Sequence, residues 1–328
     1  MSSTESPEAA VLTTAPVPPS GARAGDGETV REVTLPGLTL TVRSRTGTGG
    51  EPAVFVHGLG GSSTNWSALM RLLDDRLACE AVDLPGFGYS PPPDDGDYSV
   101  SGHARAVLRL LEADGRGPVH LFGNSLGGAV ATKIAAARPD LVRTLTLVSP
   151  ALPEIPPQRS ALPTGLFGLP GIPALVARAT RDWDAQRRTR ELVALCYGQP
   201  DEVSEADFAE HAGEYERRLA LPYFWDALSR STRGVVDAYT LGGQQSLWRQ
   251  AERVLAPTLL VYGRRDRLVS FRMATRASRA FRDSRLLALT DSGHVAMMEH
   301  PGLVARAVRE LLDDTAYHGT AYTDGGPK

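Results

Sequence analysis

The pentapeptide Gly123-Asn124-Ser125-Leu126-Gly127 decides the fold of this chain of 328 residues, because it joins a stretch typical of a strand to a stretch typical of a helix. Before it, residues 118–122 form a short apolar run that predicts a buried strand, and after it the alanine-rich residues 128–137 predict a helix. A serine at such a sharp turn has a strained backbone and a hydroxyl exposed above the sheet edge. The pattern therefore predicts Ser125 as a nucleophile and two partners further along the chain, an acid and then a histidine.

Candidates for both partners follow in that order. Residues 257–263 predict a second buried strand, and Asp266 lies just past its carboxyl end. Residues 286–290 predict another strand, and His294 lies on the loop that follows it. Because open α/β sheets collect their reactive groups at the carboxyl ends of strands, we expect Ser125, Asp266 and His294 to meet at one edge. His294 is then the general base and acid, and Asp266 the carboxylate that orients it.

Strands and helices alternate along most of the chain. Residues 31–45 alternate apolar and polar positions around Pro36-Gly37, which predicts a hairpin. Short apolar runs predict further strands at 53–56, 79–82 and 145–148. Apolar residues spaced along one face predict helices at 62–73, 100–111 and 302–312. This order predicts an α/β fold with a mostly parallel sheet and helices on both faces.

The alternation stops at Ser149-Pro150. Residues 151–173 are crowded with proline, leucine and glycine, and residues 174–248 have helical spacing before strand patterns resume at Thr258. A long segment is therefore inserted between two strands of the sheet. The predicted organisation is a disordered tail at 1–27, a core at 28–150 and 249–314, an insertion at 151–248 and a flexible tail at 315–328.

With these motifs in place, the chain resembles the α/β-hydrolase superfamily. The order Ser125, Asp266, His294 is that family's order of nucleophile, acid and histidine. Other matching stretches are residues 56–61, residues 83–90, and Gly293-His294 with Glu299 and Pro301 downstream. The resemblance covers residues 28–315. It implies the α/β-hydrolase fold, with a mostly parallel eight-stranded sheet, helices on both faces and a helical cap at 151–248 over the site.

The resemblance also implies a set of binding positions. The backbone N–H groups of Leu59 and Leu126 are expected to form the oxyanion hole, with His57 orienting the loop that carries Leu59. An apolar run in the cap suggests a pocket for an acyl or alkyl group. The expected substrate-binding residues are Gly58, Leu166, Phe167, Leu169, Ile172 and Val295. Asp266 has two neighbours in sequence, Asp283 and Asp291, that remain alternative acids.

Composition and charge exclude several classes of function. A net charge of −3, with no basic stripe interleaved with aromatic residues, gives nucleic-acid binding little support. Two cysteines, Cys79 and Cys196, do not suggest a disulfide framework. No motif predicts a metal site, and the Gly58-Leu59-Gly60-Gly61 stretch lacks the acidic partner of a dinucleotide site, so no cofactor is expected.

Residues 1–27 have no basic start and no apolar segment of the kind found in signal peptides. No stretch of about 18 apolar residues predicts a transmembrane helix. We therefore expect a cytoplasmic protein that acts on a small-molecule ester, with a peripheral protein that lacks a leader as the alternative.

Three functions remain open. The leading hypothesis is a carboxylic-ester hydrolase, resembling esterases and lipases, that works through an acyl-enzyme. A serine at 125 argues against epoxide hydrolases and haloalkane dehalogenases, which resemble this chain but use an aspartate there. The stretch Gly123 to Gly128 also resembles the carbon–carbon hydrolases of meta-cleavage diketones. That family usually has an aromatic residue after the histidine, where this chain has Val295, and its substrate carboxylate would need a cap arginine such as Arg230 or Arg233. The third hypothesis is a non-catalytic receptor with the same fold.

Overall fold

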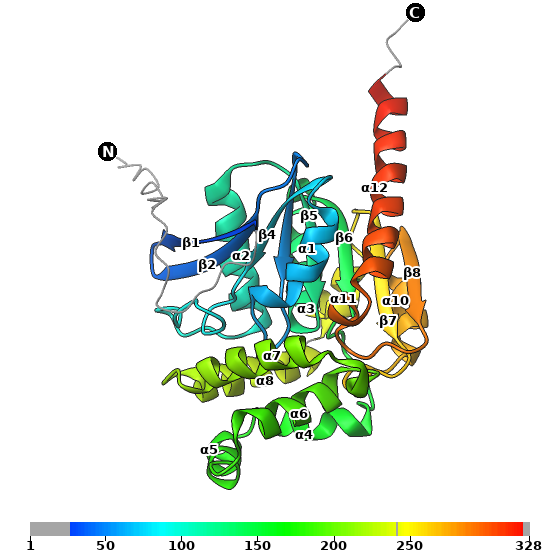
Figure 1. The fold of residues 1–328 in the computed structure, drawn as a ribbon. Coiled ribbons are helices and arrows are strands. Elements are labelled where there is room, and N and C mark those ends of the chain that lie inside the picture. The colour runs from blue at the N-terminus through cyan, green and yellow to red at the C-terminus, as the bar shows by residue number, and fades with distance from the viewer. Residues whose placement is uncertain (1–26, 241, 324–328) are drawn as a thin grey trace, which may run out of the picture.

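The computed structural model describes residues 27–240 and 242–323, and its centre is one eight-stranded sheet (Figure 1). The strand order is β1-β2-β4-β3-β5-β6-β7-β8, with β1 and β2 antiparallel to their neighbours and the others parallel. The strands are β1 Glu28–Leu35, β2 Leu38–Arg45, β3 Glu51–Val56, β4 Leu77–Val82, β5 Val119–Asn124, β6 Val142–Val148, β7 Thr258–Gly263 and β8 Ser284–Leu289. The predicted hairpin and the mostly parallel sheet are confirmed.

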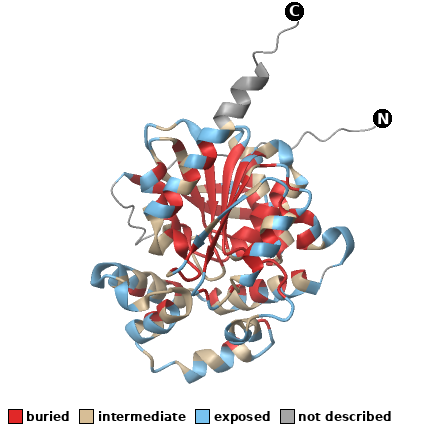
Figure 2. Ribbon diagram, turned by 90° about the vertical axis from the view of Figure 1, so that its right-hand side faces the viewer, coloured by how far each residue is buried: buried red, intermediate tan, exposed pale blue. Residues whose placement is uncertain are grey.

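Helices cover both faces of the sheet because its central strands are buried on both sides. In β3, Val54 and Val56 pack into one apolar cluster, whereas Ala53 and Phe55 pack into the other. The first cluster is closed by α2 Val100–Asp114, α3 Leu126–Ala137, α9 Leu247–Ala251 and α10 Arg272–Ala280. The second is closed by α1 Ser67–Leu73, α11 Ala296–Glu299 and α12 Pro301–Thr323. Figure 2 shows the sheet as the most buried part of the molecule.

Between β6 and β7 the chain leaves the sheet and forms a helical insertion, which we call the cap. Its helices are α4 Leu162–Leu166, α5 Ile172–Ala179, α6 Ala185–Cys196, α7 Glu205–Leu219 and α8 Phe224–Thr240. In Figure 1, α7 and α8 lie next to the core, and α4, α5 and α6 form an outer layer farther from the sheet. Short 3₁₀ helices occur in both parts of the fold: η1 Ser63–Trp66 and η2 Pro139–Leu141 in the core, and η3 Arg159–Ala161, η4 Pro200–Glu202 and η5 Gly243–Gln245 between β6 and β7.

The ends of the chain differ from the expectation in one respect. Helix α12 continues to Thr323, so it includes the first part of the segment 315–328 predicted as a tail. The tail predicted at 1–27 lies outside the described residues except for Gly27, as do residues 324–328. In the described part of the chain, no helix combines the length and apolar character needed to cross a membrane.

Candidate active site

Ser125 occupies the turn between β5 and α3, and its backbone is strained as the sequence predicts. Its φ of 51° and ψ of −115° lie in a region that residues with a side chain rarely adopt. The conformation is fixed by backbone hydrogen bonds, since the Ser125 N–H donates to the Val148 carbonyl (3.1 Å) and its carbonyl accepts from Ala151 (2.9 Å). The end of β6 therefore holds the serine at the carboxyl edge of the sheet.

The glycines around Ser125 are required by close backbone contacts. A β-carbon at Gly127 would lie 2.2 Å from the Val56 carbonyl oxygen, and one at Gly123 would lie 2.4 Å from the Gly127 carbonyl oxygen. Both distances are far inside van der Waals contact. Only glycine lets α3 begin this close to β3, so the spacing of the pentapeptide reflects packing as well as chemistry.

Asp266 and His294 form a buried hydrogen-bonded pair. His294 Nδ1 lies 2.9 Å from Asp266 Oδ2, and Asp266 Oδ1 accepts from the N–H groups of Leu268 (2.7 Å) and Val269 (2.9 Å). Burial by itself would raise the pKa of Asp266, but the facing imidazole and the two amides outweigh it and hold that pKa below its ordinary value. The carboxylate is therefore ionised at neutral pH and orients the imidazole through Nδ1.

The other two candidate acids do not contact His294. Asp291 lies 3.6 Å from His300 Nε2, and Asp283 directly precedes β8, at the start of that strand and not at its carboxyl end. Of the three aspartates, Asp266 alone is hydrogen-bonded to His294 in the described chain.

Two residues to which the sequence gave no role hold the histidine loop in place. The Asn124 amide donates to the backbone carbonyls of His294 and Val148, at 3.0 Å each. Glu299 accepts from the N–H groups of Gly293 (2.8 Å) and Gly198 (2.7 Å), so it ties this loop to the end of α6. Both belong to stretches that carry the family resemblance, but their roles depend on partners far away in sequence.

Ser125 and His294 line the same cavity. Within the described residues, no hydrogen bond joins the Ser125 hydroxyl to the imidazole. Catalytic hydrogen bonds are often long in ligand-free proteins and shorten when substrate binds. His294 is thus hydrogen-bonded to Asp266, whereas Ser125 and His294 share the cavity wall without a hydrogen bond between them in the described chain.

The expected oxyanion donors lie beside the serine. Leu126 is the first residue of α3, so its N–H has no acceptor one turn earlier in the helix, and Leu59 lies on the opposite loop of the same cavity. His57 is fully buried and uses both ring nitrogens: Nδ1 donates to the Gly58 carbonyl (2.7 Å), and Nε2 accepts from the Leu84 N–H (2.9 Å). Burial lowers the pKa of His57, so the ring is neutral and braces the loop.

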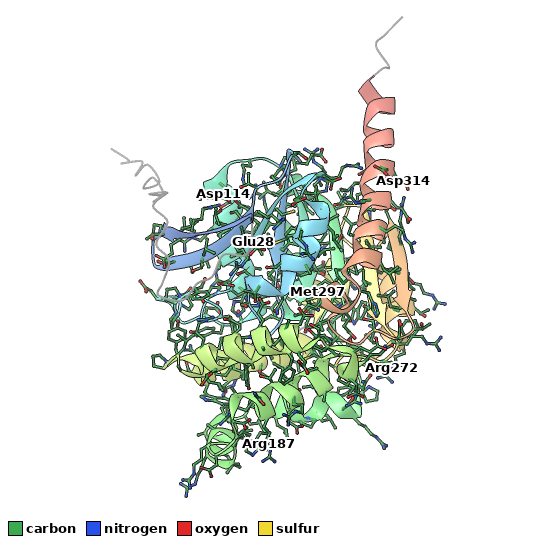
Figure 3. The ribbon with its side chains drawn as sticks, viewed as in Figure 1. Glu28, Asp114, Arg187, Arg272, Met297 and Asp314 are labelled. Carbon is green, nitrogen blue, oxygen red and sulfur yellow. The ribbon has the colours of Figure 1, made fainter. Side chains whose placement is uncertain are left out.

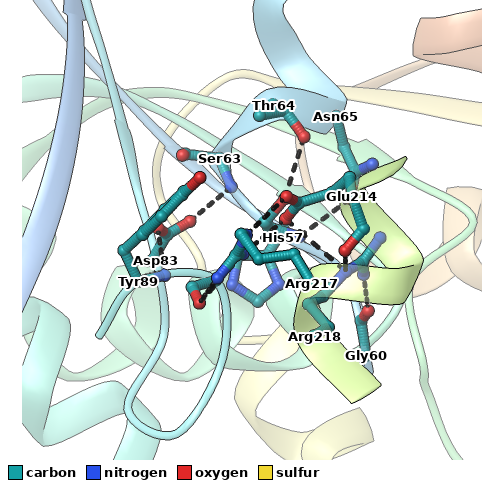
Figure 4. Close-up of polar contacts among 12 residues, drawn as sticks. His57, Gly60, Ser63, Thr64, Asn65, Asp83, Tyr89, Glu214, Arg217 and Arg218 are labelled. Atoms are coloured by element: carbon teal, nitrogen blue, oxygen red, sulfur yellow. Dashed lines mark hydrogen bonds and ion pairs between the residues drawn. The ribbon is translucent and has the colours of Figure 1, made fainter. Parts of the chain in front are cut away.

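Helix α7 of the cap is fastened to this same loop (Figure 4). The buried Arg218 guanidinium donates to the Gly60 carbonyl and lies 3.5 Å from the Glu214 carboxylate. Arg217 pairs with Glu214 at 2.7 Å, and its guanidinium lies 3.7 Å from the centre of the Tyr89 ring. The cap therefore contacts the core at the loop that carries the proposed oxyanion donor.

A cavity of about 790 Å³ lies between the cap and the core above Ser125. Of the binding residues expected from sequence, Gly58, Leu166, Phe167 and Val295 line it. Leu169 and Ile172 do not line it, and Leu169, on the turn between α4 and α5, is 52% exposed to solvent. Most of the wall is apolar, with aromatic side chains from Trp183, Tyr215, Phe224, Trp225 and Tyr239.

Few charged groups reach this cavity. Arg230 and Arg233, the arginines expected there, are instead directed to the carbonyls of Gly96 and Gly168 and do not line it. Arg188 and Arg218 line it instead, together with Glu154 and Glu191. Cys196 also lines it, but burial and the nearby Asp266 charge raise the pKa of its thiol to about 12, so it is not a competing nucleophile.

Among residues 27–240 and 242–323, no three side chains of His, Cys, Asp or Glu are grouped so that they could hold a metal ion.

Comparison with known proteins identifies similar chains. The family model described as alpha/beta hydrolase fold matches residues 52–301. A dihydrolipoyllysine-residue acetyltransferase component of the acetoin cleaving system from Cupriavidus necator is 30% identical over 78% of this chain, which spans 62% of that protein's length. Lipase 1 of Psychrobacter immobilis is 27% identical, with 83% of this chain and 77% of that protein covered.

Two further similarities bear on the choice of reaction. A 2-hydroxy-6-oxononadienedioate/2-hydroxy-6-oxononatrienedioate hydrolase of Cupriavidus pinatubonensis is 26% identical, with 81% of this chain and 88% of that protein covered. Among solved structures, a membrane phospholipase A described as a bacterial virulence factor superposes with a TM-score of 0.74 at 25% identity, covering 88% of this chain and 87% of that one.

Proposed function

This chain belongs to the α/β-hydrolase fold family, and from that premise we propose that it is a serine hydrolase cleaving carboxylic esters with an apolar acyl or alkyl group. The observation that carries the proposal is the 2.9 Å bond between His294 Nδ1 and Asp266 Oδ2 at the wall of a cavity that Ser125 also lines. A strained serine, a histidine oriented by an ionised carboxylate and an apolar cavity together favour acyl transfer.

The proposed reaction follows from these positions. Because Nδ1 of His294 faces Asp266, Nε2 is the nitrogen left to take the proton from the Ser125 hydroxyl as it attacks the ester carbonyl. The N–H groups of Leu59 and Leu126 stabilise the oxyanion. His294 then gives the proton to the leaving alcohol, and a water molecule that it activates releases the acid from the acyl-enzyme.

Replacement of the serine tests the proposal. We expect Ser125→Ala to abolish hydrolysis of a chromogenic ester with a short apolar acyl group while the thermal unfolding midpoint stays close to that of the wild type. Ser149→Ala is the matched control, since Ser149 also has a positive φ (44°), lies at the same sheet edge and does not line the cavity. Undiminished hydrolysis by the Ser125 variant would refute the proposal.

Labelling tests the same serine without assuming a substrate. A fluorophosphonate probe should modify wild-type protein at Ser125 and leave the Ser125→Ala variant unmodified. Complete inertness of the wild type would favour the non-catalytic receptor, because only an activated hydroxyl reacts with this reagent.

One observation favours the carbon–carbon hydrolase as a second candidate. Arg188 donates to the Trp183 carbonyl (3.1 Å), to the Thr180 hydroxyl (2.9 Å) and to the Thr180 carbonyl. The described residues contain no carboxylate paired with this arginine, although it lines the cavity. A substrate carboxylate, such as that of a dienoate diketone, would complement its charge.

Direct assay separates the two candidates. If the diketone is the substrate, Arg188→Gln should raise its KM by about tenfold or more, since a charged hydrogen bond is lost. Arg187→Gln is the neighbouring control, because Arg187 is exposed and stacks 4.1 Å above the Trp183 ring. An ester hydrolase without a carboxylate requirement should instead turn over no diketone and keep its KM for a neutral ester in both variants.

A further inference from the structure

The outer layer of the cap exposes four large apolar side chains within a short stretch. Leu162, Leu166, Leu169 and Leu175 are 50%, 50%, 52% and 61% exposed, and we call these four residues the leucine patch. They lie on α4, on α5 and on the turn between them. Figures 1 and 2 show that this layer is the part of the cap away from the sheet and that much of it is exposed. Clustered exposed leucines mark interaction surfaces, whereas single ones do not.

The leucine patch is continuous with the cavity above Ser125. Leu162 and Leu166 are half exposed, and both also line the cavity. The patch therefore extends from the outer surface of the cap to the wall of the cavity.

The same part of the cap carries an excess of positive charge. Residues 154–196, which include all of α4, α5 and α6, contain six arginines, two aspartates and two glutamates, a formal net charge of +2, although the whole chain carries −3. Five of these arginines are exposed: Arg159, Arg178, Arg181, Arg187 and Arg190. Arg181 lies 3.4 Å from Asp182, and the described residues contain no ion pair for the other four. Figure 3 labels Arg187 at this end of the molecule.

We propose that the leucine patch docks the cap onto an anionic lipid surface, from which an apolar acyl chain enters the cavity. Leucines inserted between headgroups, with arginines beside lipid phosphates, are the pattern of a helix that lies in a membrane interface. The +2 charge complements such a surface and repels a second copy of the same face. The source of the substrate rests on the proposed function, whereas the docking itself does not.

Vesicle binding by the full chain tests the docking. The Ser125→Ala background is used so that binding is read without hydrolysis, and a negative result on docking stays distinct from a failed esterase assay. We expect this protein to float with phosphatidylglycerol-containing vesicles and to bind phosphatidylcholine vesicles at least about tenfold more weakly. Raising NaCl from 0.1 M to 1 M, which shortens the Debye length from about 10 Å to about 3 Å, should release it.

A matched pair of substitutions locates the surface. Leu175 is 61% exposed on α5, and Leu255 is 60% exposed on the core before β7. The two leucines are therefore equally exposed, but only Leu175 belongs to the leucine patch. Leu175→Glu should weaken binding to anionic vesicles by about tenfold or more, because it removes an inserted side chain and adds a repelled charge. Leu255→Glu should bind like the parent.

Three results would overturn the proposal. The first is that the protein binds neither the phosphatidylglycerol-containing nor the phosphatidylcholine vesicles. The second is that Leu175→Glu and Leu255→Glu weaken vesicle binding equally. The third is that the protein self-associates in buffer without vesicles and that Leu175→Glu abolishes this association. The last result would assign the patch to a second copy of the chain.

Discussion

At the scale of single residues, strain marks the site more sharply than composition does. Ser125 and Ser149 are the residues other than glycine with a positive φ in the described chain, and each follows the last residue of a central parallel strand. Only Ser125 has both a cavity in front of it and a histidine on the same wall. A strained turn thus indicates a functional position only when the groups around it can use the exposed side chain.

The Asp266 carboxylate gives a prediction for activity. In Asp266→Asn, the amide oxygen can still accept from Leu268 and Val269, but an amide N–H would face the Nδ1–H of His294. The imidazole would then adopt the wrong tautomer, so we expect kcat to fall by about 10³ to 10⁴. Steady-state kinetics on the chromogenic ester measures this, and a loss below tenfold would argue that another group orients His294.

The same substitution gives a prediction for stability. Because the folded-state pKa of Asp266 lies below the ordinary value of 3.8, the charged form stabilises the fold. That contribution is fully present above the ordinary value and disappears as the pH falls through the lower folded-state pKa. Urea unfolding of wild type and Asp266→Asn should therefore differ most at pH 5 and above and converge below pH 3.8. A difference that grew on acidification would contradict the assigned shift.

At the scale of elements, the approach of α3 to β3 sets the position of Ser125. A β-carbon at Gly127 would meet the carbonyl oxygens of Val56 and His57 at 2.2 and 2.6 Å. We therefore expect Gly127→Ala to destabilise the protein by about 1–3 kcal/mol or more, since backbone must move. Denaturant unfolding measures this change.

Gly213 in α7 provides the control for that prediction. A β-carbon there meets nothing within 4 Å, so Gly213→Ala should raise the free energy of unfolding by about 0.5–1 kcal/mol through helix propensity. Similar effects from the two substitutions would show that packing between α3 and β3 does not depend on glycine.

At the scale of the whole molecule, burial divides the chain into a dense core and a looser outer cap. Every residue of β5 is buried, whereas α5 has one buried residue, Pro173. Local stability follows buried apolar contacts, so we expect amide hydrogens of α4 and α5 to exchange with solvent much faster than those of β5 and α3. Hydrogen exchange followed by mass spectrometry tests this, and comparable protection of α5 and β5 would contradict it.

Much of this architecture could be predicted from the sequence because the signals are local. Alternating and continuous apolar runs predicted the hairpin, the parallel strands and the core helices α1, α2, α3 and α12, whose observed ends differ by a few residues except at α12. Helices α10 and α11 were not predicted. The position of Ser125, Asp266 and His294 after successive predicted strands was sufficient to predict that they meet at one edge of the sheet. The hydrogen bond between His294 and Asp266 agrees with that prediction.

The cap shows where local signals end. Its first part is rich in proline and glycine and has no regular apolar period, so the sequence could not separate Leu166, which lines the cavity, from Leu169, which faces solvent. The position of Arg188, and not Arg230 or Arg233, at the cavity likewise depends on how the cap helices pack on the core.

The sequence by itself determined the strands, the strained serine turn and the order of the reactive residues, because backbone preferences and apolar periodicity act between near neighbours. Only the tertiary structure decided which cap side chains face the cavity, how Glu299 and Asn124 hold the histidine loop, and that α7 fastens to the loop at Gly60. These contacts join segments up to 170 residues apart, and the direction of a side chain there depends on which partner the fold brings to it.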